Sequence, residues 1–179
     1  KAPGIFEECL RRLRAVTPEA EIVVIDTMSS DETPEVAQRY ADRFEQWAGP
    51  EGRWTKEMYA IDDMAVARNY AFACAHPEAR WLAWIDDDDF LCIGDEAMHL
   101  LEVNGRVAPG AGKKTQVVGE GESQSLIELL KKLDLELPHV VCYWAPYLYQ
   151  SDAEGRAEGA GWQDRERFIR RDADYVWRS

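Results

Sequence analysis

Four consecutive aspartates, Asp86 to Asp89, follow directly after the apolar run Trp81 to Ile85. An aromatic-rich apolar run of this length is typical of a buried strand, so the carboxylates lie at a strand end. Like charges this close repel one another, which makes the cluster costly unless something offsets it. A divalent cation is the simplest candidate, because hard cations take carboxylate oxygens. The alternative is an acidic turn that faces water.

Within this run, Asp86 and Asp88 form a D-x-D pair. In an extended segment, residues two apart point to the same side, so this pair could address one ligand. A metal ion held by one or two carboxylates keeps positions open for phosphate oxygens. Such an ion would neutralise a diphosphate leaving group. Asp87 and Asp89 would then point elsewhere.

Two further residues could contact a ligand. Asp26 follows the β-branched run 21–25, and a carboxylate at a strand end can accept hydrogen bonds from a nucleobase or a sugar. Its alternative role is an Asx-type turn that leads into the next loop. Arg68 lies in a helix of small residues, where its fork of donors could contact an anion or a carbonyl. Its alternative role is a surface arginine whose stem covers apolar area.

The elements that position these residues alternate between helix and strand. Hydrophobic spacing and end signals predict helices over 5–16, near 34–47 and from 62 or 63 to about 76, and strands over 21–25 and 81–85. Such alternation favours an α/β fold with parallel strands joined by crossovers. Ligands of such sheets lie outside the carboxyl ends of the strands. Asp26 and the aspartate run are therefore expected to face one crevice.

The second half of the chain is less regular. Residues 104–124 are rich in glycine and predict a flexible loop, which is either a lid or an insertion. Ser125 and Glu128 predict a capping box for a helix to about residue 133. Strands are expected over 139–150 and 165–171. The second of these carries a basic cluster that either offsets a phosphate or forms a solvated face, and its members are Arg165, Arg167, Arg170 and Arg171.

Composition narrows the class of protein. The formal net charge of -13 disfavours nucleic acids and anionic membranes as partners. No apolar run approaches the roughly 20 residues of a membrane span. Cys9, Cys74 and Cys142 lie in apolar surroundings, which indicates buried thiols in a reducing compartment. We therefore expect a cytoplasmic protein with one domain over residues 1–179.

Three segments, in this order, resemble family 2 glycosyltransferases. Residues 22–33 (IVVIDTMSSDET) are similar to the nucleotide-binding strand and loop of that family. Residues 67–69 (ARN) resemble its "ARN" helix, and residues 81–89 (WLAWIDDDD) resemble its metal motif. The resemblance implies a GT-A fold, a Rossmann-like, open, mostly parallel sheet flanked by helices with a smaller antiparallel acceptor-side portion. Residues 1–103 would then form the nucleotide-sugar-binding half and residues 125–179 the acceptor-side half.

The same resemblance implies roles for individual residues. Asp26 would contact the base, Arg68 the base or the diphosphate, and Asp86 the ribose, with Asp87 also in the nucleotide-sugar site. Asp88, together with Asp86, would bind Mg²⁺ or Mn²⁺. The implied reaction is an inverting transfer from a nucleotide sugar, expected to be a UDP-sugar, to an acceptor that the sequence does not identify. Such a transfer needs a general base for the acceptor hydroxyl.

The resemblance also leaves alternatives open. The first strand of the family is absent from the chain as given, and the catalytic base is either Asp164 or a residue beyond Ser179. Asp164 could equally be an exposed loop aspartate. A non-catalytic nucleotide-sugar binding module, or an incomplete transferase domain, is the main alternative function. A nucleotidyltransferase is a third possibility, although the glycine-rich basic loop of that class is not seen in the sequence.

Overall fold

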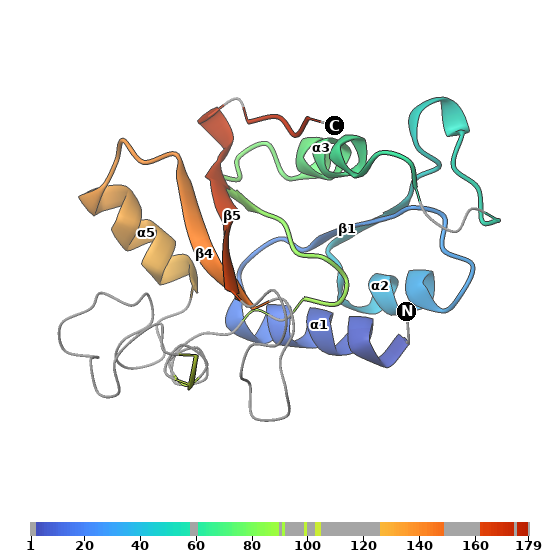
Figure 1. The fold of residues 1–179 in the computed structure, drawn as a ribbon, viewed down its shortest axis with the longest axis horizontal. Coiled ribbons are helices and arrows are strands. Elements are labelled where there is room, and N and C mark those ends of the chain that lie inside the picture. Colours follow the sequence, from blue (N-terminus) through green and yellow to red (C-terminus); the bar gives the residue numbers. More distant parts are fainter. Residues whose placement is uncertain are drawn as a thin grey trace. The chain divides into compact units, whose positions relative to one another are not determined.

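The computed structural model describes residues 3–57, 61–89, 91, 99, 103–104, 126–148, 162–173 and 175–178 (Figure 1). The chain divides into two compact units, residues 1–90 with 169–179 and residues 91–168. The candidate residues Asp26, Arg68 and Asp86 to Asp89 all belong to the first unit.

The first unit is built from short helices and strands. Its elements are α1 (Pro3–Val16), β1 (Val23–Asp26), α2 (Thr33–Tyr40), β2 (Arg43–Gln46), the 3₁₀ turn η1 (Pro50–Gly52), α3 (Met64–Cys74), β3 (Trp81–Ala83) and η3 (Arg171–Ala173). The sequence predictions of helices over 5–16 and from 62 or 63 onward are confirmed. Asp63 caps α3, since its side chain accepts a hydrogen bond from the Val66 amide at 3.1 Å.

One predicted helix is wrong in its second half. The expected helix near 34–47 ends at Tyr40, and residues 43–46 form β2, which pairs in parallel with β1. The Asp42 carboxylate accepts from the Ile22 amide at 2.8 Å and from Arg14 at 2.6 Å, which draws the chain out of the helix. Phe44 packs against the core from the strand, and it would also do so from a helix. The apolar stripe alone therefore could not distinguish a helix from a strand.

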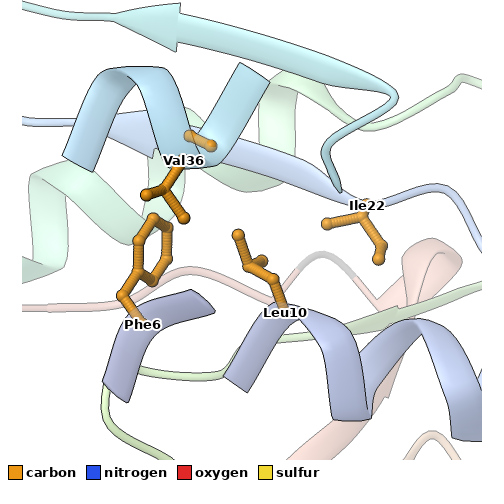
Figure 2. Close-up of a cluster of buried hydrophobic side chains, with 5 residues drawn as sticks. Phe6, Leu10, Ile22 and Val36 are labelled. Atoms are coloured by element: carbon orange, nitrogen blue, oxygen red, sulfur yellow. The ribbon is translucent and has the colours of Figure 1, made fainter. Parts of the chain in front are cut away.

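The core of the first unit lies between α1, α2 and β1. Its buried members are Phe6, Leu10, Ile22, Val36 and Ala37, and the labelled side chains point toward one another in Figure 2. In Figure 1, α3 lies on the other side of β1 from α1 and α2. The short sheet therefore has helices on both sides, which is the layering that the alternating pattern predicts.

The parallel pairing of β1 and β2 places Asp26 opposite Gln46. In a second sheet, β4 (Cys142–Leu148) and β5 (Trp162–Arg170) are neighbouring strands. The described residues thus form two small sheets, and the single open, mostly parallel sheet expected from the sequence stays a prediction.

The second unit contains α5 (Leu126–Glu136), where the sequence predicts a helix from Ser125 to about residue 133. Ser125 and nearly all of the expected loop 104–124 lie outside the described residues. Cys9 and Cys74 are buried free thiols, as expected, whereas Cys142 is half-buried. Among the described helices, none has the length and apolar character needed to cross a membrane.

Candidate functional site

Asp26 ends β1 as a buried carboxylate that is 4% exposed. Its oxygens accept from the Ser29 amide at 3.1 and 3.2 Å, which is the local turn contact considered as its alternative role. Its Oδ2 also accepts from Gln46 Nε2 at 2.7 Å. The main-chain carbonyl of Asp26 accepts from the Trp47 amide at 2.8 Å. The side chain is therefore held firmly at the carboxyl end of β1.

The loop that follows β1 carries backbone strain. Met28 has a φ of 70°, in the left-handed region that residues with a side chain seldom adopt. Such conformations cost about 1–3 kcal/mol and gather at ligand sites, where the surrounding structure holds them. Here the Asp26 carboxylate on one side and the Asp31 carboxylate on the other hold the loop, since Asp31 accepts from the Thr33 amide at 3.0 Å. The side-chain hydrogen bond with Thr33, and after it the one from the Thr33 amide, lowers the pKa of Asp31.

Arg68 and Asp86 meet at the carboxyl end of β3. Arg68 Nη2 lies 3.3 Å from Asp86 Oδ1 and 3.5 Å from Oδ2. The side chain of Arg68 is 24% exposed and that of Asp86 is 37% exposed. Arg68 is thus half-buried against a carboxylate, and the alternative of a solvent-facing surface arginine does not describe it.

Two tryptophans flank the Arg68 guanidinium. Its Cζ lies 4.1 Å from the ring centroid of Trp84 and 5.0 Å from that of Trp177. The two indoles meet edge to face, with centroids 5.2 Å apart. A cation over an indole face is attracted by the ring quadrupole. We call these four residues, Arg68, Trp84, Asp86 and Trp177, the Arg68 cluster.

The Arg68 cluster contains two unused donors. Arg68 Nε and Trp177 Nε1 are buried, and neither has a hydrogen-bond acceptor within the part of the chain that the structure describes. A buried donor without a partner costs free energy and calls for an explanation. Both donors belong to the Arg68 cluster, in which the Arg68 guanidinium pairs with Asp86. The spare Nε–H of Arg68 fits a site that takes an acceptor-rich ligand.

The aspartate run is a turn and not an extended segment. β3 ends at Ala83, and the Asp89 amide donates to the Asp86 carbonyl at 3.0 Å. Asp89 Oδ2 in turn accepts from the Asp86 amide at 3.3 Å, so Asp89 closes the turn. Asp87 and Asp88 occupy the two central positions and are exposed. The assumption that Asp86 and Asp88 share one face of a strand is therefore wrong, because a turn rotates successive side chains away from the period of two.

The residues present fit a cation only if the ligand supplies most of its coordination. Among the described residues, no group of three or more His, Cys, Asp or Glu side chains could hold a metal ion. Mg²⁺ in nucleotide sites keeps waters and phosphate oxygens and needs only one or two carboxylates. Asp88, exposed at the turn, supplies oxygens of that kind.

Asp26 and the Arg68 cluster are linked through Trp47 and Tyr70. Trp47, whose amide binds the Asp26 carbonyl, stacks on Tyr70 with ring centroids 3.9 Å apart. Tyr70 lies in α3 two residues after Arg68, and its hydroxyl donates to Glu45 at 2.5 Å. This hydrogen bond raises the pKa of Tyr70 to about 12. No hydrogen bond or ion pair between the described residues joins Asp26 directly to Arg68 or Asp86, so their expected common crevice stays a prediction.

The basic cluster near the C-terminus has structural partners. Arg170 Nη2 lies 2.6 Å from Asp172 Oδ2, and Arg171 Nη1 donates to the carbonyls of Ala75 and His76. Arg167 is buried, and the side chain of Arg165 lies outside the described residues. Arg170 and Arg171 therefore anchor the end of β5. Neither a phosphate-binding cluster nor a solvated strand face describes them fully.

Asp164 lies in β5, in the second unit. Its side chain is outside the described residues, as is the Gly159–Gly161 turn before it. Because the backbone of Asp164 is part of a strand, its alternative description as a loop aspartate is wrong. Its proposed catalytic role stays a prediction.

Sequence reasoning missed Gln46, Asn69 and Trp177 as parts of these sites. The sequence predicts a helix around Gln46, and a helix would not place Gln46 opposite Asp26 as the observed strand does. Asn69 binds Trp177 across 108 positions, a contact without a local sequence signal. One signal was available for Asn69, which falls in the segment 67–69 that resembles the family.

Comparison with known proteins gives one family match. A family model described as "Glycosyl transferase family 2" matches residues 2–94. This segment includes Asp26, Arg68 and the aspartate run. The comparisons with curated proteins and with solved structures produced no match.

Proposed function

Since the chain belongs to glycosyl transferase family 2, we propose that it transfers a sugar from a UDP-sugar to an acceptor hydroxyl. The observation that carries this proposal is the Arg68–Asp86 pair beside a turn with two exposed carboxylates, all within the matched segment. Arginine forks suit phosphate oxygens and carbonyls, and carboxylates suit ribose hydroxyls and cations.

Within this proposal, each site residue has a separate task. Asp26 accepts a hydrogen bond from the uracil, and its contacts with Gln46 and Ser29 fix its direction. Arg68 contacts the base or the diphosphate, and its spare Nε–H is a donor suited to such an acceptor. Asp86 contacts the ribose, and Asp87 belongs to the same nucleotide-sugar site. Burial of Asp26 strengthens its hydrogen bonds, because the surroundings of a buried carboxylate screen them poorly.

A divalent cation, Mg²⁺ or Mn²⁺, belongs to the same proposal. Asp88, with Asp86, would hold it, and it would neutralise charge on the diphosphate leaving group. The negative net charge of the chain makes such neutralisation necessary for an anionic donor. Arg68 contributes a second positive charge close to the same turn.

The proposed reaction is a single inverting displacement. The acceptor oxygen forms a bond to the anomeric carbon while the bond from that carbon to the diphosphate oxygen breaks. The proton of the acceptor hydroxyl passes to a general base, for which Asp164 is the candidate in this chain. UDP leaves with the electron pair, and the transition state has oxocarbenium character.

A non-catalytic nucleotide-sugar binding module is the second candidate. The observation that favours it is the extent of the family match, which ends at residue 94 and does not reach Asp164. Such a module would bind UDP through the same residues without turning over a donor. Measurement of UDP release from UDP-sugars, with a panel of acceptors, distinguishes the two candidates.

Calorimetry with UDP in the presence and absence of Mn²⁺ tests the proposed site. We expect binding that depends on the metal, and we expect Asp26→Asn and Arg68→Gln each to weaken it. Circular dichroism should show that both variants stay folded. Absence of UDP binding by well-folded protein, with either metal ion, would falsify the proposal.

A further inference from the structure

We propose that Asn69 and Trp177 are positioning residues that hold the Arg68 guanidinium in its orientation toward Asp86, so that the segment 175–178 forms part of the donor site. The inference concerns contacts within the first unit. Its consequence for donor binding rests on the proposed function, but the orientation of Arg68 does not.

The first step is the attachment of Trp177 to α3. Asn69 Nδ2 donates to the Trp177 carbonyl at 2.9 Å, and the Trp177 amide donates to Asn69 Oδ1 at 2.9 Å. One side-chain amide thus satisfies both main-chain groups of a residue 108 positions away, as a neighbouring strand would. Because Asn69 follows Arg68 directly in α3, this pair of bonds fixes Trp177 close to Arg68.

The second step concerns what restrains the guanidinium. The hydrogen bonds from Arg68 to Asp86 come from one nitrogen and are long, at 3.3 and 3.5 Å. Nε has no acceptor among the described residues. Hydrogen bonds alone therefore leave the guanidinium plane poorly fixed. The ring faces of Trp84 and Trp177, at 4.1 and 5.0 Å from Cζ, supply the remaining restraint.

The third step is the effect on a ligand. A fork of donors binds a phosphate or carbonyl well only when its plane is already oriented, because less conformational entropy is then lost. Trp84 precedes the aspartate turn in the chain, whereas Trp177 arrives from the C-terminal segment. The orientation of Arg68 thus depends on the docking of residues 175–178 through Asn69. Loss of that docking should weaken donor binding without removing any residue that touches the donor.

The test compares variants that differ in one feature at a time. Trp177→Leu removes the aromatic face, Trp177→Phe keeps a face, and Asn69→Ala releases the segment. Val176→Ala is the matched control, because Val176 is 62% exposed and adjoins Trp177. Two readouts are needed in full-length protein: the NMR resonance of the Arg68 Nε–H group, assigned by its loss in Arg68→Lys, and the Kd for UDP with Mn²⁺.

We expect Trp177→Leu and Asn69→Ala to shift the Arg68 Nε–H resonance toward that of exposed arginines and to weaken UDP binding about fivefold, as loss of a cation–π contact would. Trp177→Phe should restore most of the wild-type resonance position and most of the wild-type Kd for UDP. A purely structural role for the indole would not produce this rescue. An unchanged resonance or an unchanged Kd in Trp177→Leu would overturn the inference. If wild-type protein binds no UDP, the proposed function fails. The Arg68 Nε–H resonance alone then tests whether Asn69 and Trp177 orient the Arg68 guanidinium.

If Asn69→Ala does not fold, the comparison of Trp177→Leu with Trp177→Phe still decides the outcome. A urea titration of each variant identifies such a case. Equal resonances in the leucine and phenylalanine variants would contradict a role for the aromatic face.

Discussion

Arg68 Nη2 lies 3.3 Å from Asp86 Oδ1, which joins helix α3 to the turn after β3. The two residues are 18 positions apart, and each lies in a segment that resembles a family 2 glycosyltransferase motif. Both are half-buried, so the pair is less screened than a surface salt bridge and depends on the packing around it. The predictions below test this pair and the scaffold that holds it.

Arg68→Lys should weaken UDP binding about tenfold or more. Lysine keeps the positive charge, but it lacks the planar fork that lies against two indoles. Calorimetry of the two proteins with UDP and Mn²⁺ measures the difference. Arg39→Lys is the control, because Arg39 is an exposed arginine that pairs with Glu7 at 3.2 Å. An equal loss of UDP affinity in Arg68→Lys and Arg39→Lys would show that the effect is not specific to Arg68.

Asp88→Asn should remove the dependence of UDP binding on Mn²⁺. Replacement of an exposed carboxylate by an amide removes a charged ligand from the aspartate turn while leaving its shape nearly unchanged. Calorimetry with and without the metal gives the dependence directly. Glu19→Gln, which neutralises an exposed carboxylate in the turn after α1, should leave it unchanged. Retained metal dependence in Asp88→Asn would move the proposed cation site elsewhere.

Gln46→Ala should lower the free energy of unfolding by about 1.5–3 kcal/mol, the range for a hydrogen bond to a charged group. The variant removes the 2.7 Å bond to Asp26, whose carboxylate is 4% exposed. Urea denaturation measures the change. Gln38→Ala, at an exposed position of α2, should leave the free energy of unfolding almost unchanged, because alanine is the better helix former. A loss of similar size at Gln38 would mean that the Asp26 contact is not the cause.

Tyr70 should make stability fall at high pH. Its pKa is raised from 10.0 to about 12 by the hydrogen bond to Glu45. The folded state therefore holds the Tyr70 proton more tightly than the unfolded state. This contribution is complete below pH 10 and is lost as the pH rises toward about 12.

Tyrosinate absorbance, titrated in wild type and in Tyr70→Phe, checks the shift. The difference between the two curves should have its midpoint near pH 12. A midpoint near 10.0 would show that the Glu45 contact does not hold in solution.

Leu10→Ala should destabilise the first unit by about 2–5 kcal/mol, through lost transfer energy and the cavity left behind. Leu10 is 3% exposed and packs with Phe6, Ile22 and Val36 (Figure 2). Ile5→Ala, in the same helix but 45% exposed, should cost much less. Urea denaturation followed by tryptophan fluorescence compares them. Similar losses for both would indicate that α1 is packed differently in solution.

Local signals in the sequence determined much of the scaffold. The amphipathic spacing of α1, the helix start expected at 62 or 63 for α3 and the apolar runs at β1, β3 and β4 all predicted elements that the structure contains. The three motifs indicated the family, and the family match confirms it. These features are readable because helix periodicity, caps and strand runs depend on residues close together in the chain.

Contacts between distant residues decided the rest. Asp42 binds Ile22 and Arg14 and so turns an apparent helix into β2, which brings Gln46 to Asp26. Asn69 brings Trp177 to Arg68 from the opposite end of the chain. None of these contacts has a local period or spacing, because the free energy that fixes them comes from packing and hydrogen bonds formed only after the chain has folded.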